Sequence, residues 1–246
     1  MPEDERQPPS VDLSGPAWLE LLAEGELEIL GRLPWSSNYS FLATVRLRET
    51  EWRAVYKPGR GERPLWDYPG GLFRREVAAY ELSAALGLGI VPETVLRLDG
   101  PQGEGSVQRF VDADFSEHYF TLLNEPLYHP QLRRIAAFDL LLNNGDRKGG
   151  HLLKDEAARI WGIDHGLCFH VESKLRTVMW EFAGEELPGE VLAGCESIVE
   201  SVPEAVAELL EPDDCAALRR RAVSLLRKHR FPSPREDYRA YPWPLI

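Results

Sequence analysis

The sequence lacks long apolar runs. No stretch approaches the roughly 20 apolar residues that a membrane-spanning helix needs. The first ten residues, MPEDERQPPS, are acidic and proline-rich and lack the apolar segment of a secretory signal peptide. We therefore expect a cytoplasmic protein that does not insert into membranes.

Cysteine is scarce. The three cysteines, Cys168, Cys195 and Cys215, are far apart, odd in number and in no CxxC arrangement. This pattern argues against a disulfide scaffold and against a zinc knuckle. We interpret the cysteines as small buried apolar side chains.

Two nucleotide-binding signatures are missing as well. No GxxxxGK[ST] sequence is present, and the glycines between Gly100 and Gly105 are predicted in a hairpin rather than in a strand-to-helix turn. These absences argue against P-loop and dinucleotide-binding folds. No internal repeat is visible.

The net charge of -12 argues against nucleic acid and anionic membrane surfaces as partners. The charge is unevenly distributed: residues 46–75 hold eight Arg or Lys and four acids, whereas residues 181–215 hold eleven acids and no Arg or Lys. The basic region suits a small polyanion such as a nucleoside triphosphate. A solvated strand face explains it equally well.

The remaining composition, 43% hydrophobic and 28% charged, is that of a globular protein. Alternation and turn residues predict a short helix up to Ala23, three antiparallel strands, a glycine- and proline-rich loop, and a helix. Two further strands and a mainly helical part follow. The predicted ranges are helices 14–23, 72–86, 130–142, 189–210 and 213–229, strands 27–33, 41–48, 52–58, 91–98 and 105–111, and short strands around 152 and 160.

This order predicts an α+β, two-lobed, protein-kinase-like fold, with an antiparallel sheet lobe carrying one helix and a mostly helical second lobe. We divide the chain into a disordered start (1–12), a nucleotide-covering lobe (13–112), a helical lobe with the catalytic and metal loops (113–230), and an extended tail (231–246).

Residues 138–169 carry the main functional signal. Two apolar runs in this stretch each end in an acid and glycine-containing turns, at Asp146 and at Asp164. Glycine lets the backbone approach a ligand closely. The stretch therefore predicts a site for a metal and a phosphate.

Phosphoryl transfer needs a cation on the phosphates, a base near the acceptor hydroxyl and metal ligands. Lys57 ends the third predicted strand in Ala-Val-Tyr-Lys, much as the kinase lysine does, and Glu76 on the next helix is its expected ion-pair partner. Asp146 and His151 have the spacing of the kinase base and metal-binding asparagine. Asp164 follows an apolar strand and offers the carboxylate oxygen that hard divalent cations prefer.

These motifs carry a family resemblance. The sequence from Asp146 to His151, followed by Gly162-Ile163-Asp164-His165-Gly166, resembles the phosphatidylinositol 3- and 4-kinase-like branch of the kinase superfamily, particularly its small actinobacterial proteins. HipA-type kinases are more distantly similar. The lipid-kinase name implies fold and ATP chemistry, not a lipid substrate.

The resemblance implies a role for each matching residue. Asp146 would be the base, Lys57 would bind the phosphates with Glu76 as its partner, and Asp164 and His151 would bind Mg²⁺ or Mn²⁺. His151 stands where asparagine is usual, and imidazole suits manganese better. The remaining contacts to ATP would come from a phosphate-covering turn and a hinge at the adenine: Ser36, Ser37 and Asn38, and Gln108, Arg109 and Phe110.

Lys174, Arg176 and Trp180 are candidates to line an acceptor site. Few residues separate Asp164 from Pro188, which leaves little room for docking an extended peptide. We therefore expect nucleotide and a small-molecule acceptor as partners. Equally, these three residues would brace the lobe through acids in 181–215.

Two other functions remain open. A degenerate kinase would bind ATP and act as a sensor or scaffold without turnover. Alternatively, Asp146, His151, Asp164, His165 and His170 would form a metal-hydrolase cluster that activates water.

Overall fold

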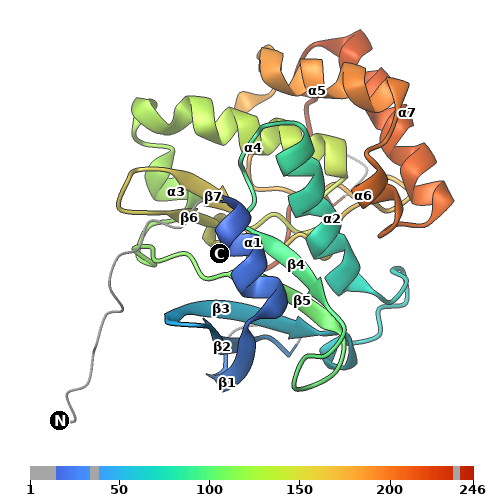
Figure 1. Cartoon of the computed structure of the whole chain (residues 1–246). Helices are drawn as coiled ribbons and strands as arrows, with labels where there is room; N and C mark the ends of the chain where they lie inside the picture. Colours follow the sequence, from blue (N-terminus) through green and yellow to red (C-terminus); the bar gives the residue numbers. More distant parts are fainter. Residues whose placement is uncertain (1–14, 34–38, 235–238) are drawn as a thin grey trace. The chain divides into compact units, whose positions relative to one another are not determined.

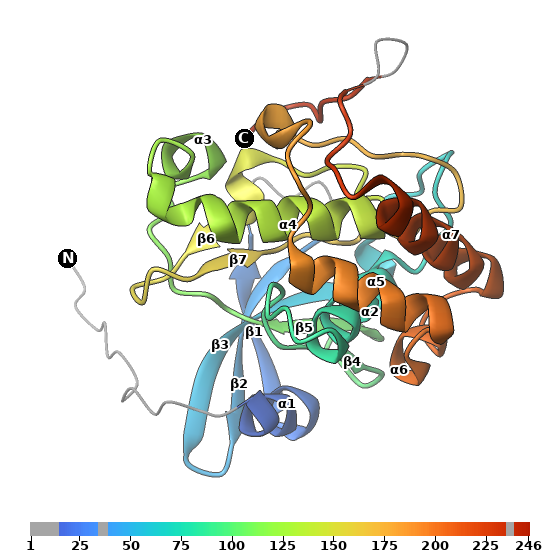
Figure 2. The same cartoon turned by 90° about the horizontal axis from the view of Figure 1, so that it is seen from above.

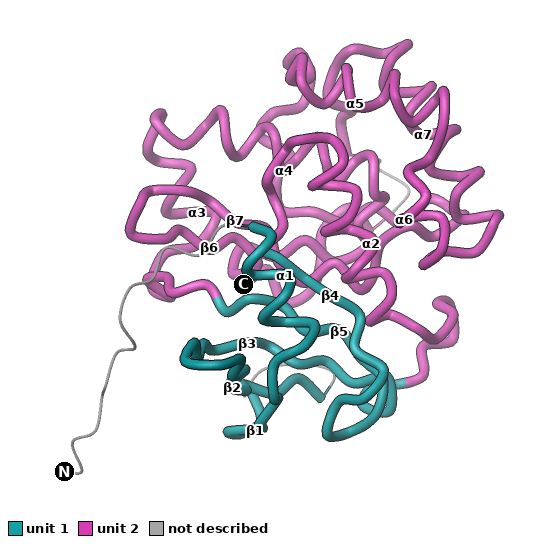
Figure 3. The backbone as a smooth tube through the Cα atoms, viewed as in Figure 1, with its two compact units in different colours: residues 1–63, 93–110 teal, residues 64–92, 111–246 magenta. Residues whose placement is uncertain are grey.

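The computed structural model describes residues 15–33, 39–234 and 239–246. Two compact units are present (Figure 3). Unit 1 contains the residues up to Arg63 together with Glu93–Phe110, and unit 2 contains Pro64–Pro92 and Val111–Ile246. Each unit is described separately.

Unit 1 is an antiparallel sheet with one helix (Figure 1). The strand order is β1-β2-β3-β5-β4, and every neighbouring pair is antiparallel. The elements are α1 (Gly15–Glu24), β1 (Glu26–Arg32), β2 (Phe41–Leu47), β3 (Thr50–Pro58), the 3-10 turn η1 (Gly59–Gly61), β4 (Thr94–Arg97) and β5 (Gly105–Arg109).

Alternation along β3 sets the core of unit 1. Ala54 and Tyr56 are fully buried, while the residues between and after them, including Lys57, lie on the opposite face. The buried face packs against Trp18 of α1, whose ring lies 5.1 Å from that of Trp52. The sheet therefore holds Lys57 at the penultimate position of β3, as predicted.

Unit 2 is mainly helical. Its elements are α2 (Leu72–Ala85), α3 (Tyr119–Leu122), η2 (Pro126–Tyr128), α4 (His129–Leu142), η3 (Gly149–His151), β6 (Leu152–Lys154), β7 (Ile160–Gly162), η4 (Trp180–Phe182), α5 (Gly189–Glu200), α6 (Glu204–Ala207) and α7 (Pro212–Lys228). β6 and β7 form an antiparallel hairpin, and α5 and α7 lie side by side (Figure 2).

One apolar cluster fills unit 2. Buried side chains of α2, α4, α5 and α7 share it, including Leu82, Phe138, Ile198 and Leu218. α4 is central because one whole face of it is buried, and proline in its first turn and left-handed Asn143 after its last residue fix both ends. Asn143 thus begins the loop that carries Asp146.

The α+β class, with an antiparallel sheet and a mostly helical part, is confirmed. Two details differ from expectation. The helix predicted over 189–210 is interrupted between α5 and α6, because Pro203 precedes α6 and Ser201 is extended. Helix α2, which we placed with residues 13–112, belongs to unit 2, because its apolar side chains join that core and Arg75 pairs with buried Asp214.

Among the described residues, every helix is too short or too polar to span a membrane.

Candidate active site

The loop that carries Asp146 is built on the end of α4. Asn143 has φ +58°, and its side-chain amide donates to the carbonyls of His170 and Glu172. The side chain of Asn144 accepts the N–H of Asp146 at 3.0 Å and donates to Asp139 at 2.9 Å. Such turns are typical of asparagine. The two asparagines therefore fix the backbone from which Asp146 projects.

Arg147, next to Asp146, is completely buried. Its guanidinium binds both carboxylate oxygens of Asp139, at 2.7 and 3.0 Å, and this bidentate geometry is the strongest form of such a pair. Burial alone lowers the pKa of Arg147, but the Asp139 carboxylate outweighs this effect and raises it. Arg147 therefore stays charged inside unit 2.

Asp146 itself is partly exposed, with 27% of its side chain accessible. Burial raises its pKa to about 6; the nearby Lys148 ammonium, 3.2 Å away, opposes the rise and Asp164 adds to it. A carboxyl group with a pKa close to neutral is suited to accept and return a proton.

Asp164 follows β7 in a left-handed conformation, with φ +61°. This conformation is uncommon outside glycine and persists where neighbouring structure holds it. Its carboxylate lies 3.2 Å from Nε2 of His151 and is 45% exposed. The structure thus brings the two predicted metal ligands together.

The hydrogen bonds of His151 assign its tautomer. Its Nδ1 accepts the N–H of Lys148 at 3.4 Å, so in the neutral ring Nε2 carries the proton and faces Asp164. Binding of a metal through Nε2 would require that proton to leave. In this arrangement, Asp164 is the better ligand of the two.

Among the described residues, no group of three or more His, Cys, Asp or Glu side chains lies close enough to hold a metal ion. The predicted metal-hydrolase cluster is therefore wrong: His165 is buried against Arg147, and the ring of His170 packs on Tyr68. The Asp164 and His151 pair offers one carboxylate and one imidazole, and Mg²⁺ in proteins is usually held by one or two carboxylates together with substrate phosphates.

Glu76 is buried on α2, with 3% of its surface exposed. One carboxylate oxygen accepts the N–H of His165 at 2.9 Å. Glu76 therefore supports the residue that follows Asp164, a contact that the sequence did not predict. Its neighbour Glu81 is only partly buried.

The other predicted nucleotide contacts belong to unit 1. Lys57 pairs in register with Ser106, and the side chain of Gln108 donates to Thr94. The N–H of Phe110 donates to the main-chain carbonyl of Arg53, and the guanidinium of Arg53 lies 4.6 Å from the centre of the Phe110 ring. The N–H of Arg109 donates to the carbonyl of Glu93. The predicted phosphate-covering turn, Ser36, Ser37 and Asn38, lies outside the described residues.

The three candidate acceptor residues have defined partners in unit 2. Lys174 lies 3.2 Å from Glu172 and 3.5 Å from Asp67. The alternative prediction was that acids in 181–215 pair with these residues. For Lys174 this alternative is wrong, because Asp67 and Glu172 both lie outside that range. The backbone N–H of Arg176 donates to Asn144, which joins this segment to the Asp146 loop.

Residues 239–246 form no helix or strand and are hydrogen-bonded to the same region. The Ala240 carbonyl accepts both the N–H of Thr177 and the indole N–H of Trp180, each at 3.0 Å. The Leu245 carbonyl accepts the N–H of Gly149 at 2.7 Å. The main-chain oxygen of Leu245 therefore binds to the loop between Asp146 and His151, and that of Ala240 binds to the segment from Thr177 to Trp180.

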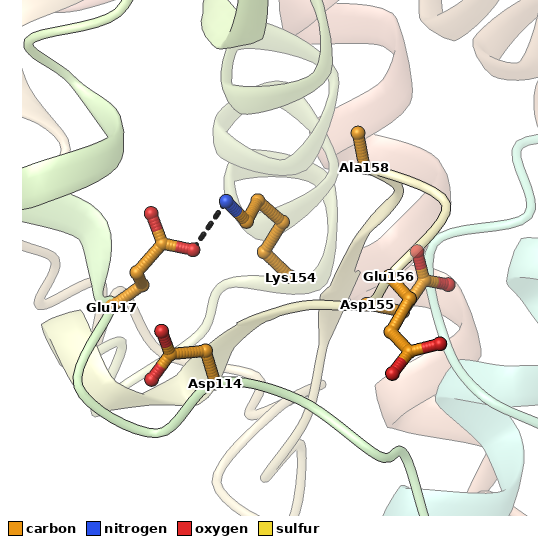
Figure 4. A pocket seen from close by; sticks show the side chains of 6 residues that line it. All are labelled: Asp114, Glu117, Lys154, Asp155, Glu156 and Ala158. Atoms are coloured by element: carbon orange, nitrogen blue, oxygen red, sulfur yellow. Dashed lines mark ion pairs between the residues drawn. The ribbon is translucent and has the colours of Figure 1, made fainter.

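A separate hollow of about 250 Å³ lies beside the β6–β7 hairpin (Figure 4). Lys154 forms an ion pair with Glu117 there, and three further acids, Asp114, Asp155 and Glu156, line it together with Ala158. None of the predicted site residues lines this hollow.

Sequence reasoning missed Asp139 and Arg147 as parts of the site. We took Asp139 as part of an apolar run and Arg147 as a loop residue. One signal in the sequence could have identified this pair. Asp139 is a lone acid inside an apolar helix, a buried charge needs a partner, and Arg147 follows eight residues later.

Comparisons with known proteins give one strong relative. The chain is 40% identical over 262 aligned positions to protein Rv2133c of Mycobacterium tuberculosis, covering 91% of this chain and 94% of that protein. No protein-family model matches.

Two of the solved structures that are similar to the chain are described as kinases. The proinflammatory kinase CtkA of Helicobacter pylori has a TM-score of 0.48 and 12% identity, covering 83% of this chain and 97% of that one. The kinase PK-1 of Cydia pomonella granulovirus has a TM-score of 0.33 and 16% identity, covering 58% and 54%. At these values, neither kinase identifies an activity or a substrate for this chain.

Proposed function

The chain belongs to the family of the mycobacterial protein Rv2133c, and we propose that it is an ATP-dependent phosphotransferase related to the phosphatidylinositol 3- and 4-kinase-like branch. The observation that carries the proposal is the pair of loops in unit 2. One presents Asp146 with a pKa of about 6, and the other presents Asp164 beside His151. The order of elements along the chain also supports it.

In this proposal, Asp146 takes the proton of the acceptor hydroxyl. Its raised pKa makes it a stronger base than an ordinary aspartate, yet it is mostly ionised at neutral pH. Lys148, 3.2 Å away, helps to keep it ionised. Asp146 thus orients the hydroxyl toward the phosphate.

Asp164 would be the main metal ligand, with His151 beside it. A bound Mg²⁺ or Mn²⁺ would neutralise charge on the transferred phosphate. Lys57 in unit 1 is assigned to the phosphates, and Glu76 to Lys57, on the resemblance of the sequence. Ser36, Ser37, Asn38, Gln108 and Phe110 are assigned to the nucleotide on the same ground.

For the acceptor, we propose a small molecule with a hydroxyl group rather than a lipid. Lys174, Arg176 and Trp180 are the candidate lining. Because Lys174 already lies near two carboxylates, Asp67 and Glu172, we favour a neutral polar acceptor over a strongly anionic one.

Calorimetric titration of ATP, with magnesium and then with manganese, tests the nucleotide site. We expect metal-dependent binding that is lost in Asp164→Ala and Lys57→Ala. Glu156→Ala, an exposed acid of the separate hollow, is the matched control and should bind normally. Absence of ATP binding by the unmodified chain with either metal would refute the proposal.

An ADP-release assay with a panel of hydroxyl-bearing metabolites then tests turnover. We expect Asp146→Asn to bind ATP but to release no ADP above background. If the unmodified chain binds metal and ATP yet never releases ADP, the degenerate-kinase alternative holds. Transfer to proteins alone would refute the small-molecule acceptor.

A further inference from the structure

Arg147 contacts both loops of the proposed site. A guanidinium has five N–H donors in a fixed planar arrangement. Besides the two bonds to Asp139, Nη1 donates to the carbonyl of Ile163 at 2.7 Å and lies 3.3 Å from the carbonyl of His151. Nη2 also lies 2.8 Å from Nε2 of His165.

The acceptors of Arg147 share a position in the chain. Ile163 and His165 immediately precede and follow Asp164, and His151 ends the loop that Asp146 begins. Arg147 itself follows Asp146. Two of the five contacts therefore join the residues on either side of the proposed metal ligand to Arg147, the residue next to the proposed base.

The geometry points to Arg147 as a positioning residue that sets the place of Asp164 relative to Asp146. This inference rests on the proposed function. Asp139 holds the guanidinium from α4, and the guanidinium then holds the Ile163 carbonyl and the His165 ring. Arg147 is not exposed and does not itself touch substrate.

The backbone of Asp164 explains why such support is needed. Its left-handed conformation is unfavourable for a residue with a side chain and persists only where contacts on both sides hold it. The bond from Arg147 to Ile163 holds the side before Asp164. The bond from His165 N–H to Glu76 holds the side after it.

A simpler role for Arg147 is to neutralise the buried charge of Asp139. Lysine at position 147 separates the two roles, because an ammonium keeps the charge but cannot reproduce the planar set of donors. If neutralisation is the whole role, Arg147→Lys keeps its function. If positioning is the role, the Arg147→Lys variant folds but no longer holds the residues on either side of Asp164 in place.

The experiment compares the unmodified chain with Arg147→Lys and with the control Arg133→Lys. Arg133 lies on α4 and, like Arg147, pairs with an acid, here Glu185, but its side chain is 30% exposed. The readouts are thermal unfolding, metal-dependent ATP binding by calorimetry, and hydrogen exchange of the peptide covering residues 160–166.

We expect the Arg147→Lys variant to fold. Its metal-dependent ATP binding should be about 10- to 100-fold weaker, which is the usual effect of changing a group that orients metal ligands. The amide hydrogens of residues 160–166 should exchange faster. Arg133→Lys should change neither. A folded Arg147→Lys with affinity within twofold of the unmodified chain and unchanged exchange would overturn the inference.

If Arg147→Lys does not fold, the double variant Arg147→Gln/Asp139→Asn removes both buried charges and is tested in the same way. Normal ATP binding by this variant would overturn the inference, and weakened binding would support it. Should neither variant fold, the Nη–H resonances of Arg147 in the unmodified chain decide, because Nη1 and Nη2 make the contacts on either side of Asp164. Slow exchange with water that persists with Mg²⁺ and ATP supports the inference, whereas exchange as fast as that of Arg133 refutes it.

The two proposals fail in different ways. If the unmodified chain does not bind ATP with metal, the proposed function fails. If it does bind and Arg147→Lys binds equally well, only the role of Arg147 fails.

Discussion

Replacing Asp146 by asparagine is expected to stabilise the folded chain while it removes the proposed base. The pKa of this carboxyl is about 6 in the folded chain, against an ordinary value of 3.8, mainly because it is buried. Folding therefore favours the protonated form. An asparagine is uncharged at every pH and does not incur the cost of burying an anion.

The sign and the pH window follow from this shift. The stability that the raised pKa supplies is fully present below about pH 4 and is lost as the pH rises through about 6. The difference between the two pKa values corresponds to about 3 kcal/mol. The pKa of about 6 already includes the opposing effect of Lys148, so we expect Asp146→Asn to gain up to about 3 kcal/mol above pH 7 and little at pH 4.

Urea unfolding followed by tryptophan fluorescence, without nucleotide and between pH 4 and pH 8, measures the effect. Glu156→Gln, a change at an exposed acid, is the control and should leave the unfolding free energy within about 0.5 kcal/mol of the original. A variant that is less stable at pH 8, or a difference that does not change with pH, would refute the raised pKa. The same pKa predicts that kcat/KM of the unmodified chain falls about tenfold per pH unit below pH 6.

Three further changes test the scaffold. Gly105→Ala would place a Cβ 2.5 Å from the carbonyl oxygen of Lys57, so β3 would have to shift. We expect the unfolding free energy in urea to fall by about 1–3 kcal/mol and ATP binding in calorimetry to weaken. Arg75→Met leaves the buried carboxylate of Asp214 without the guanidinium it pairs with at 2.8 Å; we expect a loss of about 3–5 kcal/mol in unfolding free energy, largely recovered by Arg75→Met/Asp214→Leu. Trp66→Ser changes a side chain that is 94% exposed; its unfolding free energy should stay within about 0.5 kcal/mol of the original, and a larger loss would show that Trp66 packs more than its exposure indicates.

Local patterns were sufficient to predict most elements. Alternation predicted the strand that ends near Lys57, and helical spacing with a glycine stop predicted Leu72–Ala85. Both signals depend on residues close in the chain, so the sequence alone carries them. The interrupted helix after residue 200 shows the opposite error, because we gave helical spacing more weight than Pro203.

Contacts between distant residues could not be predicted in this way. Lys174 lies near Asp67, more than one hundred residues earlier, and Glu76 supports the N–H of His165. Spacing placed Asp146, His151 and Asp164 on two loops but did not show what holds these loops together. That depends on buried pairing of Asp139 with Arg147, which only the folded chain shows.

The bonds that residues 239–246 make to Gly149, Thr177 and Trp180 have a practical consequence for protein production. Leu245 already binds Gly149, and Ala240 binds Thr177 and Trp180. An affinity tag fused after Ile246 would extend from a main chain held against the proposed active site. Binding and turnover measurements should therefore use protein from which such a tag has been cleaved, or protein tagged at the opposite end.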